Sequence, residues 1–315
     1  MPAGLENVLA FFRQTDENGM TNGEKVSARA QVLRRVPETD KGKSYERAEG
    51  PSASSDYPLG VVVEDGRLIG LGIHIFNEDV YPIQSFEITL RGCGLTGHLD
   101  LSECREMVIL DLYRNEISSV ALGSLPAMRI LGLQDNHISA LDPTGLSACQ
   151  GIDVGKNRLE TLDVSQNTEL VELYVNDNLL TSLDTKGNPK LKYLYCHNNG
   201  IPSLDATANP LLRHLDTTGN PMVSIRCLAP QREGPLPLEL TAGEGGTVGL
   251  KFQPVYNAQW KETGEWQQSY HACPKEGYRF VGWQDGEGNI LSTDAVWQDS
   301  YGASRVLTAV FRAED

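Results

Sequence analysis

Between residues 107 and 227 the sequence repeats one pattern of apolar residues and an asparagine six times, at a constant step of 21 residues. The first of these six regular copies contains Met107, Leu110, Leu112, Asn115 and Ile117. The next five copies begin at Met128, Cys149, Leu170, Leu191 and Leu212, and their asparagines are Asn136, Asn157, Asn178, Asn199 and Asn220. A fixed period of this length indicates a solenoid, in which each copy packs against its neighbours.

The spacing inside each copy predicts one short strand. Leu110 and Leu112 are two residues apart, and so are Leu194 and Cys196, so the members of each pair share one face of a strand. We expect this face to be buried, and the strands of successive copies to lie in parallel about 4.8 Å apart. The asparagine that ends each strand can both donate and accept hydrogen bonds, so it can satisfy backbone groups in the buried turn that follows.

The return path between strands is too short for an ordinary helix, because only about ten residues remain for it. A second set of asparagines lies on this path, and two of them precede a proline, which disfavours helix in the residue before it. We therefore expect an extended or irregular connection. On this path a leucine recurs with an aspartate directly after it. We expect the leucine to face the core in a short segment and the aspartate to close the turn that follows. The asparagines are Asn167, Asn188 and Asn209, and the leucines are Leu162, Leu183 and Leu204.

The pattern LxxLxLxxNxL resembles the leucine-rich repeat family, and its short 21-residue form is similar to the internalin-type repeats of bacteria. The resemblance implies a right-handed parallel solenoid, assigned to the α/β class by the convention of that family although this chain is expected to be mostly β. We assign residues 85–229 to an array of seven copies. The first copy spans residues 85–106, with Ile88, Leu90, Cys93 and Leu95 in register.

Residues 1–84 are expected to cap the start of the array, because an uncovered first copy would expose its core. Residues 5–14 place Leu5, Val8, Leu9 and Phe12 on one face of a helix. Residues 37–56 are polar and rich in Ser and Pro, which predicts a loop. Residues 59–75 alternate around a Glu-Asp-Gly turn, which predicts a hairpin. A helix and hairpin before the first copy resemble the N-terminal cap of many leucine-rich repeat proteins.

A calcium loop is one interpretation of the residues that follow the first helix. Asp16, Asn18, Asn22 and Glu24 carry suitable oxygen ligands, but Thr21 stands where such a loop requires glycine. We favour a surface turn over a metal site.

The chain beyond residue 229 has a different composition, with all four tryptophans in residues 260–297. Residues 230–237 contain three prolines and are expected to form a linker, and residues 238–315 a small antiparallel β domain. Strands are expected at 247–252, 278–283 and 306–311, with a turn at 285–289. These segments resemble the internalin B-repeat modules of bacterial surface proteins, which implies a role in spacing and presenting the array, without catalysis.

The charge and cysteine content exclude several classes of protein. The net charge is −15 and no basic cluster occurs, so we expect no nucleic-acid partner. No run of 18 apolar residues is present, so we expect no transmembrane segment. Six cysteines are too few for a disulfide scaffold, and Cys149 and Cys196 lie at buried positions of the repeat. A bridge between Cys93 and Cys104 is left open.

No pattern of catalytic, cofactor or metal-binding residues stands out. Cys196 and His197 are neighbours on a strand and point to opposite faces, so they cannot form a thiolate pair. The histidines lack metal-binding spacings, and the glycine-rich stretch at 243–249 precedes a strand instead of opening a helix. We predict no enzyme activity, no cofactor and no metal.

One irregular group of side chains occupies the outward face of the expected strands. Aromatic residues from three adjacent copies fall together, and at the spacing of neighbouring strands their rings should touch. Tyrosine is enriched where proteins bind partners, so this group is a candidate binding patch; the alternative is a solvated sheet whose tyrosines pack only on each other. The candidate residues are Tyr174, Tyr193, Tyr195, His197 and His214, with Asp153 and Asp216 alongside.

A weaker candidate is an apolar group near the first copies, formed by Ile109, Ile130 and Tyr113. We favour the interpretation that residues 25–56 cover it.

Together these features predict a non-enzymatic binding protein whose concave sheet recognises a protein or a glycan. The resemblance implies a bacterial protein that is secreted or lies at the cell surface, and anchoring there would depend on a signal upstream of Met1. The alternative is a structural or adhesive stalk without a specific ligand.

Overall fold

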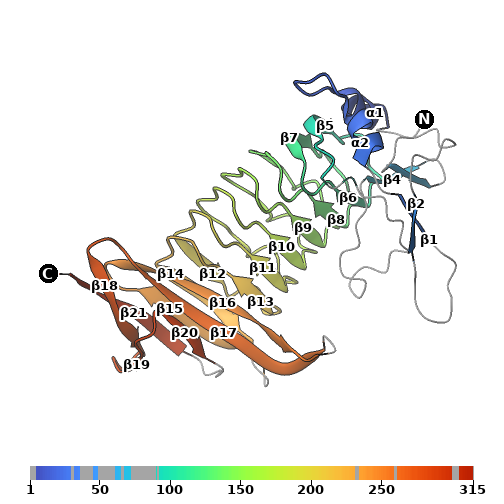
Figure 1. The fold of residues 1–315 in the computed structure, drawn as a ribbon. Coiled ribbons are helices and arrows are strands. Elements are labelled where there is room, and N and C mark those ends of the chain that lie inside the picture. The colour runs from blue at the N-terminus through green and yellow to red at the C-terminus, as the bar shows by residue number, and fades with distance from the viewer. Residues whose placement is uncertain are drawn as a thin grey trace. The chain divides into compact units, whose positions relative to one another are not determined.

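The computed structural model describes residues 5–29, 32–35, 45–48, 61–64, 67–71, 90, 92–230, 234–258, 261–299 and 305–314. The chain divides into two compact units, Met1–Arg158 and Leu159–Asp315. Helices occur only before residue 30 in this described part, and the rest consists of strands, turns and irregular segments (Figure 1). None of the described helices is long and apolar enough to cross a membrane.

The first unit begins with two short helices. Helix α1 (Leu5–Arg13) confirms the helix expected over residues 5–14, and it buries Val8, Phe11 and Phe12. Helix α2 (Asn22–Arg29) was not predicted, so the surface turn expected around residues 16–24 is wrong from Asn22 onward.

A capping box explains why α2 begins where it does. The Glu24 carboxylate accepts a hydrogen bond from the Thr21 N–H (2.8 Å), and the Thr21 hydroxyl oxygen accepts one from the Glu24 N–H (3.1 Å). These reciprocal bonds satisfy two backbone donors that the helix itself leaves unpaired. The Thr-Asn-Gly-Glu spacing is a sequence signal for this helix start. Glu24 therefore caps a helix, whereas the calcium-loop interpretation treated it as a metal ligand.

Two hairpins follow. Strands β1 (Val32–Arg35) and β2 (Tyr45–Ala48) pair antiparallel, so the loop expected at 37–56 is wrong at 45–48; the rest of that segment lies outside the described residues. Strands β3 (Val61–Glu64) and β4 (Arg67–Leu71) form the hairpin expected within 59–75.

The main sheet of the first unit is built from single strands of successive copies. Strands β6 (Ile109–Asp111), β8 (Ile130–Gly132) and β9 (Gly151–Asp153) are parallel, with each residue paired to the one 21 positions later, as predicted. Hairpin strand β4 pairs in parallel with β6 at the start of this sheet. On the return path, β5 (Thr96–Asp100) and β7 (Glu116–Ala121) form a separate parallel pair.

The first copy, 85–106, therefore differs from the expectation. Its residues Leu90, Cys93 and Leu95 are buried as expected, but Leu90 is not in a strand, and β4 is the neighbour of β6. Ile88 lies outside the described residues. The copy still provides the turn, because the Leu95 N–H donates to the Asn115 side chain.

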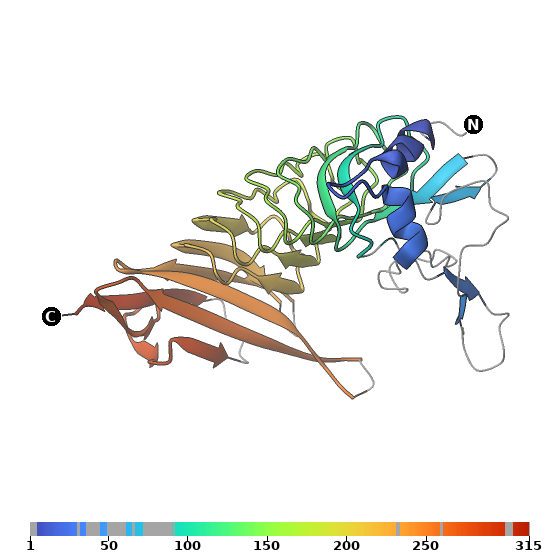
Figure 2. The ribbon, with the colours of Figure 1, turned by 45° about the horizontal axis from the view of Figure 1, so that its top comes forward.

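The second unit continues the repeat with strands β10 (Glu172–Tyr174), β11 (Tyr193–Tyr195) and β13 (His214–Asp216). They are again parallel with a step of 21 residues. The return path is irregular except for β12 (Ser203–Ala206) and β14 (Ser224–Ala229), which pair in parallel. Successive turns of this ribbon are visible beside the labelled strands in Figure 1 and from a second side in Figure 2.

The asparagine at the end of each strand ties its copy to the preceding one. Asn199 Nδ2 donates to the carbonyl oxygens of Val175 (2.9 Å) and Cys196 (3.1 Å), and its Oδ1 accepts from the Leu180 N–H (3.0 Å). The same bonds recur at Asn115, Asn136, Asn157 and Asn220. These bonds satisfy backbone groups of the buried turn, as the sequence predicted.

The residue before each of these asparagines has a positive φ, the left-handed conformation that L side chains rarely adopt. At five of the six positions the residue is not glycine, so the turn geometry overrides its local preference. These five are Arg114, Asp135, Lys156, Asp177 and Asn198, and the sixth is Gly219.

The regular polar residues of the return path are also structural. Asn209 Nδ2 donates to the carbonyl oxygens of Thr185 and Asn188, both at 2.9 Å. Each repeated aspartate accepts a hydrogen bond from the N–H two residues later, as Asp184 does from Lys186 (3.0 Å). Asp163 and Asp205 do the same, which confirms the predicted Asp turns.

The C-terminal module consists of two packed sheets and contains all three expected strands. One sheet contains β16 (Gly246–Tyr256), β17 (Glu262–Pro274) and β20 (Val296–Asp299). The other contains β15 (Leu236–Ala242), β21 (Arg305–Ala313), β18 (Tyr278–Gln284) and β19 (Ile290–Ser292). The pairs are antiparallel except β15 with β21. Trp283, Tyr270 and Phe252 are fully buried between the sheets.

The module joins the last copies of the array by strand pairing on both sides of the solenoid. Strand β16 pairs antiparallel with β13, and β15 pairs antiparallel with β14. Leu236 and Pro237 belong to β15, so the linker expected at 230–237 is wrong for these two residues. Proline is tolerated there because it lies near the start of its strand.

A threonine marks the end of the array. Thr217 occupies the position at which earlier copies bury Leu112, Leu133, Val154, Val175 or Cys196. Its hydroxyl oxygen accepts from the Leu250 N–H (2.8 Å), and its own N–H donates to the Leu250 carbonyl (2.9 Å). The last copy therefore uses a polar side chain to bind the module.

All six cysteines are free thiols, so Cys93 and Cys104 are not bridged. Burial raises the pKa of Cys149 and of Cys196 to about 12, which makes both thiols poor nucleophiles.

We predict that Thr217→Val destabilises the chain by about 1–3 kcal/mol, because it leaves the buried Leu250 N–H without its acceptor while keeping the side-chain shape. Thr217→Ser keeps the hydroxyl and is the matched control, with a loss below about 1 kcal/mol. Urea unfolding monitored by tryptophan fluorescence measures both. Equal stability of the valine variant and the wild type would contradict the role of this bond.

Candidate functional site

The outward side chains of β10, β11 and β13 form the predicted aromatic contacts. The register places Tyr174 beside Tyr195 and Tyr193 beside His214. The leucine at the centre of each three-residue strand is buried in the core. The rings of Tyr174 and Tyr195 are stacked with centroids 5.2 Å apart, and those of Tyr193 and His214 with centroids 4.4 Å apart. The expectation that these rings touch is confirmed.

The module adds a fifth ring, from Tyr256 at the end of β16. Its ring stacks on that of His214 with centroids 6.5 Å apart, and its hydroxyl lies 3.3 Å from His214 Nε2. The Tyr195 hydroxyl lies 3.4 Å from His214 Nδ1. We call Tyr174, Tyr193, Tyr195, His214 and Tyr256 the aromatic patch.

Stacking decides which parts of these rings face solvent. Tyr193, Tyr195 and Tyr174 are half-buried, and Tyr256 is 38% exposed. Each stacking contact covers one face of a ring, and part of each tyrosine side chain remains exposed. A phenol edge can form hydrogen bonds and apolar contacts together, with little loss of side-chain entropy on binding.

Burial favours the uncharged form of His214 in the patch and of Glu172 beside it. Burial, with a smaller contribution from neighbouring Arg213, lowers the pKa of His214 to about 4. Burial raises the pKa of Glu172, which pairs with Tyr193 across the sheet, to about 7. The row Glu172, Tyr193 and His214 is therefore neutral at mildly acidic pH.

Asp216 and Arg213, two charged residues beside the patch, are each paired with a residue of the module. Asp216 Oδ2 lies 3.0 Å from Lys251 Nζ, and its Oδ1 accepts from the Thr218 hydroxyl (2.7 Å). Burial alone would raise the pKa of Asp216, but these bonds hold it below its usual value. Arg213 forms an ion pair with Glu262 and lies over the ring of Trp266, at 5.6 Å.

His197 lies at the edge of the patch. Its ring meets that of Tyr195 edge-on, with centroids 6.3 Å apart. Its Nε2 is 3.8 Å from Asp177, and its Nδ1 is 4.0 Å from Asp216. His197 and Asp216 thus border the aromatic patch as expected from the strand positions.

Asp153 belongs to β9 of the first unit, where its Oδ1 accepts from the Gly155 N–H (3.2 Å). The weaker apolar candidate is wrong as an exposed surface, because Ile109 and Ile130 are only 4% and 3% exposed. This burial agrees with the favoured interpretation that they are covered. Most of the segment proposed as their cover lies outside the described residues.

Four module residues at the site were not among the residues expected from the sequence: Lys251, Tyr256, Glu262 and Trp266. Lys251 lies within the strand expected at 247–252, and Tyr256 lies at the end of β16, beyond that expected strand. The sequence contains no periodic signal for pairing between β13 and β16, so their position beside the array could not be inferred.

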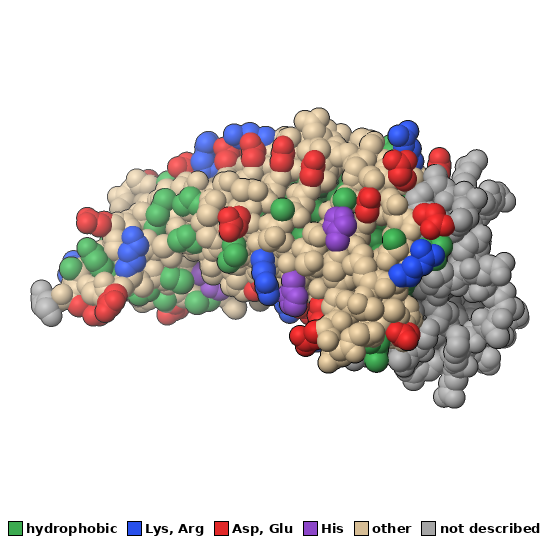
Figure 3. Space-filling model, turned by 90° about the horizontal axis from the view of Figure 1, so that it is seen from above, with side chains coloured by type: hydrophobic (Ala, Val, Ile, Leu, Met, Phe, Trp, Pro, Cys, Tyr) green, Lys and Arg blue, Asp and Glu red, His purple; other side chains and the backbone are tan. Residues whose placement is uncertain are grey.

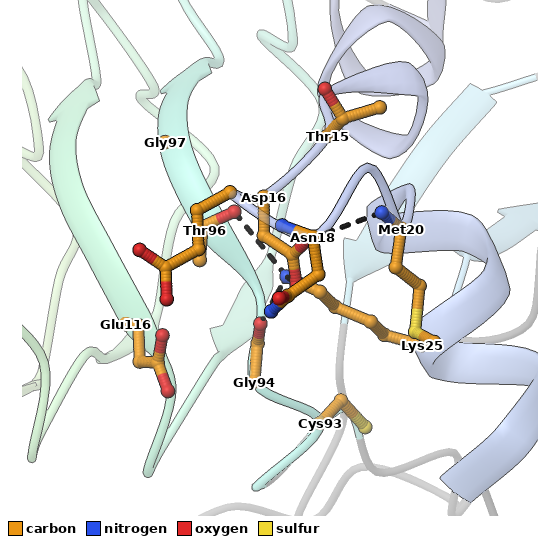
Figure 4. Close-up of a pocket in the computed structure, with 11 residues that line it drawn as sticks. Thr15, Asp16, Asn18, Met20, Lys25, Cys93, Gly94, Thr96, Gly97 and Glu116 are labelled. Carbon is orange, nitrogen blue, oxygen red and sulfur yellow. Dashed lines mark hydrogen bonds and ion pairs between the residues drawn. The ribbon is translucent and has the colours of Figure 1, made fainter.

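A cavity of about 780 Å³ lies in the first unit, between the α1–α2 connection and the first copy (Figure 4). Lys25 is buried there, with Nζ 2.8 Å from the Gly94 carbonyl and 3.2 Å from Asp16. These contacts hold α2 against the array, which explains the lysine structurally. Asp16 also accepts bonds from the Asn18 and Met20 N–H groups.

The proposed calcium ligands serve other roles. Asp16 pairs with Lys25, Glu24 caps α2, and the Asn22 amide donates to the carbonyls of Phe11 (3.0 Å) and Thr96 (2.9 Å). Among the described residues, His, Cys, Asp and Glu side chains form no cluster suited to a metal ion.

The sequence contains 42 Asp and Glu residues against 27 Lys and Arg. On the face drawn in Figure 3, carboxylates lie in a row along one edge, with Lys and Arg side chains in small groups.

The structure predicts opposite pH effects on stability from Glu172 and His214. The raised pKa of Glu172 gives a stabilisation that is present below pH 4.5 and is lost as the pH rises to about 7. The lowered pKa of His214 gives one that is present above pH 6.5 and is lost as the pH falls to about 4. In Glu172→Gln only the histidine term remains, so stability should rise between pH 4 and 6.5 by on the order of 2–3 kcal/mol.

His214→Gln should show the reverse slope, with stability falling between pH 4.5 and 7. Urea unfolding at half-unit pH steps measures both profiles. If both variants keep the wild-type profile, these two groups do not titrate as the structure indicates.

Comparisons with known proteins give three solved structures and one family model that resemble parts of this chain. The functional domain of InlJ from Listeria monocytogenes, described as including a cysteine ladder, is 16% identical, with 56% of this chain and 55% of that chain covered and a TM-score of 0.33. An internalin, InlF, of the same organism is 18% identical over 39% of this chain and 44% of that chain, with a TM-score of 0.33.

A leucine-rich repeat protein of Leptospira interrogans is 17% identical over 39% of this chain and 45% of that chain, with a TM-score of 0.30. The matches thus span about half the length of each of these structures. Among curated proteins, none matches. Residues 236–315 match the family of the divergent InlB B-repeat domain, which confirms the resemblance expected for the module.

Proposed function

We propose that this chain is a non-enzymatic binding protein of the bacterial surface, and that the aromatic patch binds a protein partner. The observation that carries the proposal is the stack of tyrosines from adjacent copies, whose side chains are ordered by their contacts and remain partly exposed. The leucines, asparagines and aspartates of the repeat have structural roles, whereas nothing in the repeat requires aromatic residues at these outward positions. The surface location is supported by the internalin B-repeat match of the module.

The ring geometry favours a protein over a glycan. A sugar ring binds best against an open aromatic face, but stacking already covers one face each of Tyr174, Tyr195 and Tyr193. Protein partners instead use tyrosine for its edge, its hydroxyl group and its area, and such residues dominate the binding energy of many interfaces. The half-buried rings are already ordered, which lowers the entropy lost on binding.

A catalytic role has no support from the groups that could perform it. Cys196 is fully buried with a pKa of about 12, and it lies on the core side of the sheet. Both ring nitrogens of His214 lie beside the hydroxyls of Tyr195 and Tyr256, and burial raises the pKa of both phenols, which disfavours their nucleophilic phenolate forms.

A structural stalk is the second candidate function. It is favoured by the pairing of β13 with β16 and of β14 with β15, which connects the last copies to the module through two sheets. A stalk would hold its shape in this way without binding a ligand.

The proposal predicts that peptides selected from a displayed library on the full-length chain will depend on Tyr174 and Tyr195. The double variant Tyr174→Ala/Tyr195→Ala should weaken their binding at least about 30-fold, since hot-spot tyrosines contribute about 2 kcal/mol or more. Tyr113→Ala, a tyrosine beside an array strand of the first unit, is the matched control and should leave binding within about twofold. Affinity is measured by biolayer interferometry.

Circular dichroism and urea midpoints must show that the double variant is folded. If the selected peptides bind the folded double variant as tightly as the wild type, or if selection yields no binding peptide, the stalk is the better description.

A further inference from the structure

We propose that the C-terminal module is part of the binding surface, with Tyr256 as a contact residue, and that this shared surface fits an uncharged, hydrogen-bonding segment of a protein. The inference rests on the proposed function and adds to it both a second part of the chain and the chemistry of the partner. A module that only spaced the array would contribute nothing to the site.

The strand register brings the module to the patch. Asp216 of β13 is paired with Lys251 of β16, and directly opposed residues of antiparallel strands point to the same face. The outward face of the array therefore continues onto β16. The pairing of β16 with β17 shifts between Pro254 and Tyr256, and such an irregularity re-aims the side chains that follow it.

Tyr256 has two features of a contact residue. Its ring and hydroxyl both meet His214, so its position is fixed by the array. It is nevertheless 38% exposed, whereas the other members of the aromatic patch are half-buried or buried. A tyrosine that is held on one side and open on the other is already arranged for binding.

The charges around the patch point to a neutral partner. Asp216 is paired with Lys251, and Arg213 is paired with Glu262. Glu172 and His214 are buried, and burial favours the uncharged form of each. Between about pH 4 and pH 7 these residues therefore present no unpaired charge beside the tyrosine hydroxyls, although the chain as a whole has a net charge of −15.

A charged partner would have to compete with existing ion pairs to gain an electrostatic contact. An uncharged segment with N–H, C=O or O–H groups can instead pair with the tyrosine hydroxyls. Binding of this kind is insensitive to salt, because screening acts on charges and not on neutral hydrogen bonds.

The experiment uses the full-length chain and the two tightest peptides from a displayed library of random twelve-residue peptides. Their dissociation constants are measured for wild type, Tyr256→Ala, Tyr256→Phe and the control Val306→Ala, an exposed position on the module's other sheet. We expect at least tenfold weaker binding for Tyr256→Ala, a smaller loss for Tyr256→Phe, and no change for Val306→Ala. Raising NaCl from 50 to 500 mM should change wild-type affinity less than threefold.

The outcomes separate this inference from the proposed function. If Tyr174→Ala/Tyr195→Ala loses binding but both Tyr256 variants bind within twofold of the wild type, the module is not part of the surface and the proposed function survives. If none of the tyrosine variants loses binding, both fail. A tenfold loss of affinity at high salt, or selection of highly charged peptides, overturns the neutral partner.

The chain is also tested on a glycan array. A glycan whose binding requires Tyr256, with no peptide selected, overturns the protein partner. Tyr256→Phe keeps the ring that packs on His214, so it remains interpretable if Tyr256→Ala proves unstable. Unchanged urea midpoints in either variant exclude loss of fold as the cause.

Discussion

The buried side-chain amide of the repeated asparagine is the interaction on which the rest of the structure depends. Asn199 donates to carbonyls of its own and the preceding copy and accepts an N–H from the preceding copy, so it fixes the distance and register between them. A constant register puts equivalent outward positions side by side. The contact between Tyr193 and His214 follows from this, because they are 21 residues apart.

A stack of copies needs a special end, since its last strand would otherwise leave backbone groups unpaired and apolar surface exposed. Here the module provides that end. Thr217 replaces the usual apolar residue and exchanges hydrogen bonds with Leu250, while β16 pairs with the last array strand. The same strand then carries Lys251 and Tyr256 to the edge of the aromatic patch. Termination of the array and completion of the candidate site are thus achieved by one strand.

Much of the array could be predicted because its information is periodic. The strands, both asparagine sets, the Asp turns and the ring contacts all follow from one step of 21 residues. What escaped prediction depends on single or distant contacts. Helix α2 begins at one capping box, and β2 pairs with β1 from within a segment that was expected to be a loop. The contact of Tyr256 with His214 depends on a pairing that no repeat encodes.

The central claim is that the last copies and the module form one cooperative structure, and native-state hydrogen exchange tests it most directly. The amides of Leu180 and Ile201 donate to the asparagine ladder, and the amide of Leu250 donates to Thr217. Their opening free energies should agree within about 1 kcal/mol and fall together as denaturant is added. If the Leu250 amide instead exchanges through a separate opening of much lower free energy, the module is an independent appendage and the account is wrong.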